Sequence, residues 1–186
     1  MGKVLEEIDA SLAGFLRAQR LFFVASAPTS VDGMVNVSPK GLEGSFAVLG
    51  PREVAYLDLT GSGAETIAHL RDNGRICLMF CAFDGPPRIV RLHGRGEAVP
   101  LGDPRFPALA GHFADLPGAR SVVRVDVTRV ADSCGFAVPR MEFAGDRDQL
   151  VRWAGNRGPG GLAAYRAERN AVSIDGLPAF TPPGGG

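Results

Sequence analysis

The sequence predicts a mainly β protein, a β-barrel with flanking α-helices, and three observations carry this prediction. Apolar and polar residues alternate with period two in several short segments of the first 130 residues, which is typical of half-buried strands. Turn signals such as Asp32-Gly33 and Gly50-Pro51 separate these segments, as they do in antiparallel hairpins. Alternating β and α units with glycine-rich loops after the strands are missing, which disfavours a doubly wound parallel sheet.

The first third of the chain is expected to form one helix and two pairs of strands. Apolar residues recur at helical spacing over residues 4–20, which predicts an amphipathic helix. A short apolar run at residues 21–26 and the alternating segment at 34–40 flank the Asp-Gly turn and predict a hairpin. Residues 45–49 and 54–58 form the next predicted pair around the Gly-Pro turn.

The residue pattern in the middle of the chain predicts a short helix followed by two long strands. Ser62 is placed to cap a helix over residues 64–73, with Glu65 as its capping-box partner. Residues 75–82 and 87–99 then read as strands, the second with one apolar and one cationic face.

The remainder of the chain is less regular. A helix is predicted over residues 103–113, and a valine-rich alternation predicts a strand over 121–130. Two charged helices are expected over 146–156 and 160–170, and the Pro- and Gly-rich tail at 182–186 is expected to fray. We therefore expect one domain over residues 1–186, with a barrel core over about 20–130 and a helical extension over about 131–180.

Composition limits the partners of this chain. Of its 186 residues 45% are hydrophobic, and 20 Lys and Arg balance 20 Asp and Glu, so no overall field attracts nucleic acid or an anionic membrane. No apolar stretch is long enough to span a bilayer, and the N-terminus lacks the features of a signal peptide. We expect a cytoplasmic protein with neither a nucleic-acid nor a membrane partner.

Strand 34–40 carries the first candidate for an anion site. Its period-two alternation places Asn36, Ser38 and Lys40 on one face and Val35 and Val37 on the other. Polar donors and a cation therefore converge on one side of the strand. Such a face could hold a phosphorylated cofactor, and it could equally be turned toward water.

The turn that enters the helix at 64–73 is the second candidate. A helix N-terminus offers unpaired backbone N–H groups and partial positive charge. Gly61 allows a ligand to approach the backbone, and the hydroxyls of Thr60, Ser62 and Thr66 add donors, so the turn could hold a phosphate. The alternative is that Ser62 only caps the helix.

The sequence offers no metal site. Cys77 and Cys81 lie in a predicted strand, which would separate their sulfur atoms by about 13 Å, too far to share one zinc ion. The three histidines are scattered without ligand spacing. Lys40 and Arg91 remain as cations for an anion, although a strand Lys or Arg commonly faces water.

Four segments in order give the chain a family resemblance. They are residues 35–41 (VNVSPKG), 56–63 (YLDLTGSG), 73–80 (NGRICLMF) and 88–96 (RIVRLHGRG). Together they resemble the pyridoxamine 5'-phosphate oxidase-related family of FMN-binding split barrels, over roughly residues 20–130. The segments at 134–139 and 173–178 resemble the C-terminal part of a bacterial subgroup whose members are mostly uncharacterised.

The resemblance implies a six-stranded antiparallel split barrel that forms a homodimer, with FMN in the groove between two barrels. It implies that Lys40 meets the flavin or its phosphate, that Thr60 and Ser62 meet the phosphate and that Arg91 lies at the edge of the site. Further residues of the implied cofactor site are Asn36, Ser38, Asp58, Gly61 and Thr66. Whether the C-terminal segment reaches the partner's groove stays open.

The function implied is an FMN-binding oxidoreductase of unknown substrate and electron donor. The alternative is a non-catalytic protein that binds or stores a flavin, a deazaflavin or haem. The sequence departs from the family's oxidases, because Glu65 and Thr66 stand where they carry an Arg-Lys pair and Val35 replaces an Arg. Oxidation of vitamin B6 is therefore not implied.

Overall fold

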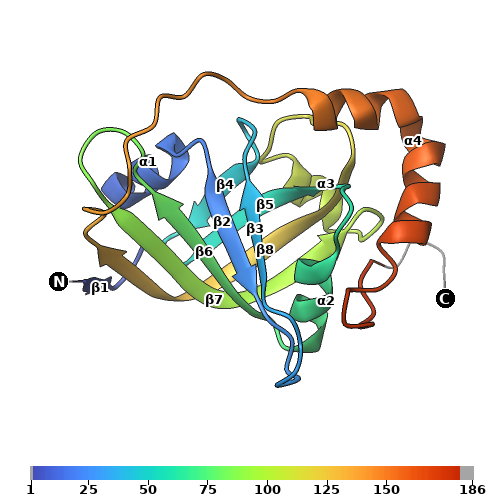
Figure 1. Ribbon diagram of the computed structural model, residues 1–186, viewed down its shortest axis with the longest axis horizontal. Coiled ribbons are helices and arrows are strands. Elements are labelled where there is room, and N and C mark those ends of the chain that lie inside the picture. The colour runs from blue at the N-terminus through green and yellow to red at the C-terminus, as the bar shows by residue number, and fades with distance from the viewer. Residues whose placement is uncertain (1, 181–186) are drawn as a thin grey trace.

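Every strand pairing in the sheet is antiparallel, as the hairpin signals predict. The computed structural model describes residues 2–180. The strands are β1 (Lys3–Leu5), β2 (Phe22–Ser26), β3 (Asn36–Lys40), β4 (Phe46–Gly50), β5 (Glu53–Leu59), β6 (Arg75–Cys81), β7 (Ile89–Pro100) and β8 (Ala119–Ser133). The helices are α1 (Ala10–Ala18), α2 (Glu65–Asp72), α3 (Phe106–Ala110) and α4 (Gln149–Arg169) (Figure 1).

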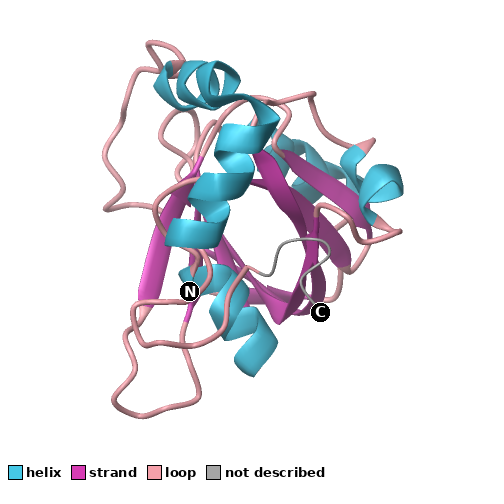
Figure 2. Cartoon of the chain, turned by 90° about the vertical axis from the view of Figure 1, so that its right-hand side faces the viewer, coloured by secondary structure: helices cyan, strands magenta, loops and turns pink. Residues whose placement is uncertain are grey.

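The sheet curls into an open barrel. Its hydrogen-bonded order is β3-β2-β6-β7-β8-β5-β4, with β1 added to β8, and the two end strands β3 and β4 share no ladder. Figure 2 shows the strands curving around a common interior with helices outside them. The predicted class, mainly β with flanking helices, is confirmed, and the split lies between β3 and β4.

The strand count differs from the implied six. Each of the seven predicted strand segments forms a strand, and β1 adds an eighth. Residues 4 and 5 were predicted to begin a helix, but as part of β1 they pair with Ala131 and Val130 of β8. Asp9 instead caps α1 by accepting a hydrogen bond from the Leu12 N–H at 2.7 Å, so this helix starts at Ala10.

The core fills the inside of the barrel. Four aromatic rings from β2, β4, β5 and β6 pack with centroids 5.0 to 5.7 Å apart, namely Phe22, Phe46, Tyr56 and Phe80. Leu12 and Leu16 of α1 belong to the same cluster, so this helix covers part of the core. Burial of such large side chains supplies the main driving force for the fold.

The predicted cap of α2 is wrong. The residue before the helix is Ala64, and no side chain caps its first turn. The Glu65 carboxylate does not turn back toward Ser62, because it accepts a hydrogen bond from the Ile174 N–H at 3.3 Å. A hydrogen bond to a residue distant in sequence therefore replaces the predicted capping box of Ser62 and Glu65.

The predicted C-terminal helices are the two halves of α4. Gly158 breaks the helical geometry with φ 63°, and Pro159 follows it. A positive φ suits glycine, and the residue before a proline is disfavoured in helical geometry. α3 is shorter than predicted, and no helix within residues 2–180 is long and apolar enough to cross a membrane.

Candidate functional site

A pocket of about 1210 Å³ opens where β3, β5 and the start of α2 come together. The irregular segment 134–148 between β8 and α4 also lines the pocket, and we call it the strap. The strap runs along the top of the molecule in Figure 1. Asn36, Ser38, Lys40, Asp58, Gly61 and Thr66, all predicted site residues, line this pocket. The structure thus brings six of the nine predicted residues together.

The alternation on β3 has its polar face toward the pocket. Asn36 donates from Nδ2 to the Thr66 hydroxyl at 3.1 Å, and Ser38 donates to the Asn36 Oδ1 at 3.3 Å. Val37, on the other face, is 60% exposed. The polar side chains of β3 and α2 therefore form one hydrogen-bonded network on one side of the pocket.

Asp58 is the centre of a buried charge cluster. Its carboxylate, 2% exposed, receives Lys40 Nζ at 3.0 Å, Arg120 Nε at 2.7 Å and the Ser121 hydroxyl at 3.2 Å. Burial acts to raise the pKa of Asp58, but the Arg120 guanidinium and the Lys40 ammonium outweigh it and hold the pKa well below its usual range. Asp58 is therefore ionised at neutral pH, and the cluster keeps one net positive charge.

Sequence reasoning missed Arg120. This side chain is 4% exposed and also donates to the Gly63 carbonyl oxygen at 2.8 Å. It precedes the predicted strand at 121–130, where an arginine reads as a surface residue. In the sheet, Asp58 of β5 pairs with Ser121 of β8. Only this pairing brings the neighbouring Arg120 close to the Asp58 carboxylate.

Three predicted ligands lie outside the pocket lining. The Thr60 hydroxyl, 1% exposed, donates to the Gly118 carbonyl at 2.8 Å and so points away from the pocket. Ser62 is exposed, and Arg91 on β7 donates to the Ser133 hydroxyl at 3.3 Å. Their roles as cofactor ligands stay predictions.

The turn at 60–63 presents backbone to the pocket. The space beside Gly61 is open, because no atom lies within 4 Å of the place where a Cβ would stand. Beside Gly63, a Cβ would stand 3.6 Å from Glu65 Oε1. Within residues 2–180, the backbone N–H groups of 61–64 donate to no protein acceptor. Of these four residues, Gly61 and Gly63 line the pocket.

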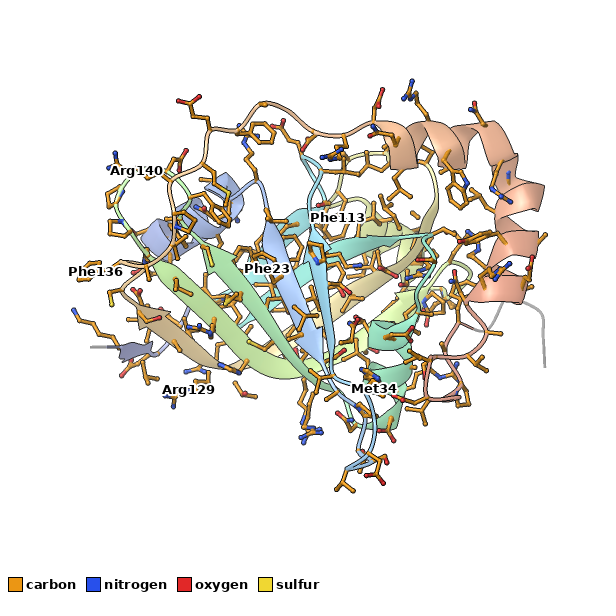
Figure 3. The ribbon with its side chains drawn as sticks, in the orientation of Figure 1. Phe23, Met34, Phe113, Arg129, Phe136 and Arg140 are labelled. Atoms are coloured by element: carbon orange, nitrogen blue, oxygen red, sulfur yellow. The ribbon has the colours of Figure 1, made fainter. Side chains whose placement is uncertain are left out.

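The strap is tied down on both sides of the pocket. The Met141 N–H donates to the Phe83 carbonyl at 2.9 Å, and Asp146 Oδ2 accepts from the Glu43 N–H at 3.2 Å. Phe143 lies between these ties and lines the pocket, with the Arg20 guanidinium 5.1 Å from its ring centre. By contrast Phe136, labelled in Figure 3, stands outside the pocket and is 82% exposed.

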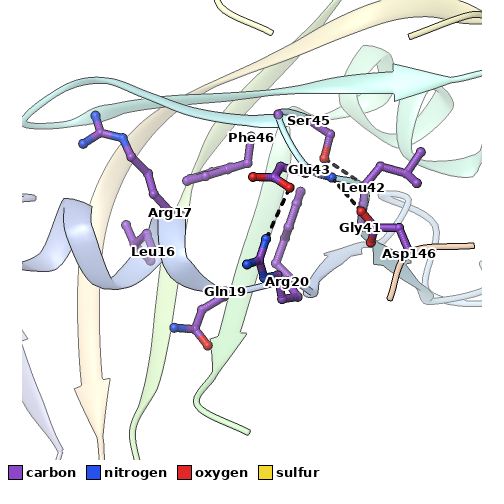
Figure 4. Close-up of a pocket in the computed structure, with 12 residues that line it drawn as sticks. Leu16, Arg17, Gln19, Arg20, Gly41, Leu42, Glu43, Ser45, Phe46 and Asp146 are labelled. Atoms are coloured by element: carbon purple, nitrogen blue, oxygen red, sulfur yellow. Dashed lines mark hydrogen bonds and ion pairs between the residues drawn. The ribbon is translucent and has the colours of Figure 1, made fainter. Parts of the chain in front are cut away.

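A second, smaller cavity continues from the pocket. It measures about 70 Å³ and lies between α1 and the β3–β4 connection (Figure 4). Arg20 and Glu43 form an ion pair at 3.5 Å beside it, and Gly41, Leu42 and Asp146 line both spaces. The connection between β3 and β4 therefore borders both spaces.

The pocket is balanced in charge. Its cationic side chains are Arg20, Lys40, Arg120 and Arg147, and its anionic ones are Asp58, Glu65, Glu142 and Asp146. The net charge of the pocket therefore favours neither an anion nor a cation. In the part of the chain that the structure describes, no three His, Cys, Asp or Glu side chains gather to hold a metal ion.

Comparison with known proteins decides the family. Residues 8–134 match the family described as Pyridoxamine 5'-phosphate oxidase. The chain belongs to this family. A curated member, the pyridoxamine 5'-phosphate oxidase family protein ustO of Aspergillus flavus, is 43% identical over 193 aligned residues, which cover 94% of this chain and 76% of ustO.

Two solved structures share the fold. A variant of HupZ from Group A Streptococcus aligns with a TM-score of 0.52 and 20% identity, over 68% of this chain and 99% of HupZ. HupZ from the same organism aligns with a TM-score of 0.50 and 21% identity, over 66% and 91% of the two chains. Most of the strap and the whole of α4 lie beyond the residues that match the pyridoxamine 5'-phosphate oxidase family.

Proposed function

We propose that this member of the pyridoxamine 5'-phosphate oxidase family is an FMN-binding oxidoreductase that works as a homodimer. The observation that carries the proposal is the pocket, which joins the polar face of β3 to an open glycine turn at the N-terminus of α2. Family membership makes a flavin the first ligand to consider for such a pocket.

The residues of the pocket fit FMN. The free N–H groups of 61–64 and the positive end of α2 suit a phosphate, and the open space beside Gly61 allows it to approach. Lys40 adds a cation, and the volume of about 1210 Å³ exceeds the usual range of small-molecule sites. Apolar side chains such as Leu57 and Phe143 line the pocket and suit a planar ring system.

Bound FMN would supply hydride and electron transfer. The chain contributes charge, orientation and exclusion of water. Lys40, whose Nζ donates to Asp58 at 3.0 Å, and the Ser38 hydroxyl are the donors placed to stabilise negative charge on a ligand bound against β3. The strap covers part of the pocket and limits access of water to it.

The surface of β3 supports a homodimer. β3 is an end strand of the sheet, and Val35 and Val37 beside its outer face are 71% and 60% exposed. An unpaired strand edge with exposed apolar side chains is a natural place for another chain to dock. A second copy of this chain would bury these valines.

A visible spectrum followed by anaerobic reduction tests the proposal. Protein purified in air should show a bound oxidised flavin, or should acquire its spectrum when FMN is added. NADH or NADPH should then bleach the flavin band under anaerobic conditions, and an added electron acceptor should restore it. A colourless protein that fails to bind added FMN would contradict the proposal, as would a spectrum of haem or deazaflavin. Binding of FMN without reduction by any donor would favour a carrier over an enzyme.

A further inference from the structure

Buried hydrogen bonds join the end of α4 to the glycine turn of the pocket. Asn170, the residue that follows α4, is fully buried and donates from Nδ2 to the Gly61 carbonyl at 2.9 Å. Its Oδ1 accepts from Arg120 Nη1 at 2.8 Å. Asn170 therefore links the turn to the charge cluster around Asp58.

Two more contacts hold the same turn. Arg120 donates from Nη2 to the Gly63 carbonyl at 2.8 Å, and Arg166 of α4 donates from Nη1 to the Thr60 hydroxyl at 3.3 Å. Arg120 and Arg166 are 4% and 7% exposed, so water competes little for these bonds. Arg120 and Asn170 thus bind the carbonyl groups of the turn, and Arg166 binds the hydroxyl of Thr60.

The geometry of the peptide bond links these contacts to the direction of the N–H groups in the turn. In a trans peptide, the C=O of one residue and the N–H of the next point in opposite directions. Holding the Gly61 carbonyl toward Asn170 directs the N–H of Ser62 away from it. Holding the Gly63 carbonyl toward Arg120 directs the N–H of Ala64 in the same manner. These N–H groups are among those that lack a protein acceptor.

We propose that Asn170 is a positioning residue for the anion-binding turn, so that docking of α4 and binding of a phosphate group at the turn stabilise each other. The proposal rests on the proposed function, in which FMN places its phosphate at this turn. It adds a role for a segment beyond the family match at 8–134. By linkage, the factor by which α4 docking strengthens phosphate binding equals the factor by which phosphate strengthens docking.

A comparison of FMN with riboflavin, which lacks the phosphate, tests the role of Asn170. We expect Asn170→Ala to weaken FMN binding about fivefold or more, since the Gly61 carbonyl loses its donor and the turn its fixed orientation. Riboflavin affinity should stay unchanged. The matched control is Asn156→Ala, an exposed asparagine of the same helix, which should change neither affinity. Equal loss for both ligands, or no loss for FMN, would overturn the proposal.

Hydrogen exchange on the wild-type protein provides a second test that does not depend on how the variant folds. FMN should slow amide exchange in the second half of α4, residues 160–169, and inorganic phosphate at millimolar concentration should do so more weakly. Riboflavin should leave exchange there unchanged. No protection by FMN or phosphate would overturn the coupling. If wild-type protein binds no FMN, the proposed function fails, and the phosphate measurement alone then decides whether the turn and α4 are coupled.

Discussion

The charge on Asp58 organises one side of the pocket. It is buried with two cations, and such a cluster is stable only while all its members are present. The alternation of Asn36, Ser38 and Lys40 could be predicted from sequence, because a strand places alternate residues on one face. The contribution of Arg120 could not, since it depends on which strand lies beside β5.

Replacing Asp58 should reveal this organisation in the acid range. The pKa of Asp58 is lowered in the folded protein, so its ionised form stabilises the fold above the pKa of about 4 of an unfolded Asp. That contribution is lost as the pH falls below about 4 toward the folded pKa. We expect Asp58→Asn to lower the free energy of unfolding by about 3–5 kcal/mol at pH 7, because Arg120 stays buried without its carboxylate.

Urea unfolding between pH 2 and 7 measures both effects. The wild-type protein should lose stability on acidification more steeply than Asp58→Asn does. Asp32→Asn, an equal change of charge in an exposed loop, serves as control and should follow the wild type. Parallel pH profiles for Asp58→Asn and the wild type would contradict this account of the cluster.

The carboxylate of Glu65 should oppose binding of a phosphate. This carboxylate lines the pocket in the first turn of α2, where a phosphate would also lie. We expect Glu65→Gln to tighten FMN binding severalfold by removing this repulsion, with little effect on riboflavin. Titration by flavin fluorescence measures both affinities, and the exposed change Glu7→Gln is the control. Weaker FMN binding in Glu65→Gln would show that the phosphate lies elsewhere.

At the scale of elements, the strands could be predicted well and the connections could not. Each predicted strand segment is present because period-two alternation and short apolar runs report the local environment of half-buried and buried strands. The strap has no such periodicity, and its place over the pocket depends on ties to Phe83 and Glu43, far away in sequence. The false cap at Ser62 has the same origin, since Ile174 competes for Glu65.

The strap should shield a bound flavin. Phe143 lines the pocket, whereas Phe136 of the same segment does not. In FMN-loaded protein we expect Phe143→Ala to increase quenching of flavin fluorescence by iodide about twofold or more and to raise the FMN Kd, because an apolar wall is lost. Phe136→Ala should leave both values unchanged. Equal effects of the two variants would contradict a role of the strap at the pocket.

At the scale of the whole molecule, the edge strand β3 predicts association. Sedimentation should give twice the chain mass of 19.5 kDa at micromolar concentration. Val37→Lys, which places a charge on the exposed face of β3, should shift the protein toward monomer while its circular dichroism is retained. Thr128→Lys, at an exposed position of β8, is the control. A monomer in the wild type would contradict the proposed homodimer.

The central claim is that the pocket beside β3 and α2 holds FMN with its phosphate at the glycine turn. Calorimetric titration of the flavin-free protein with FMN and with riboflavin tests it most directly. We predict one FMN per chain and a Kd for FMN at least about tenfold below that for riboflavin, because charge-assisted hydrogen bonds to the phosphate add to binding of the ring. Absence of FMN binding, or equal affinity for the two ligands, would contradict the claim.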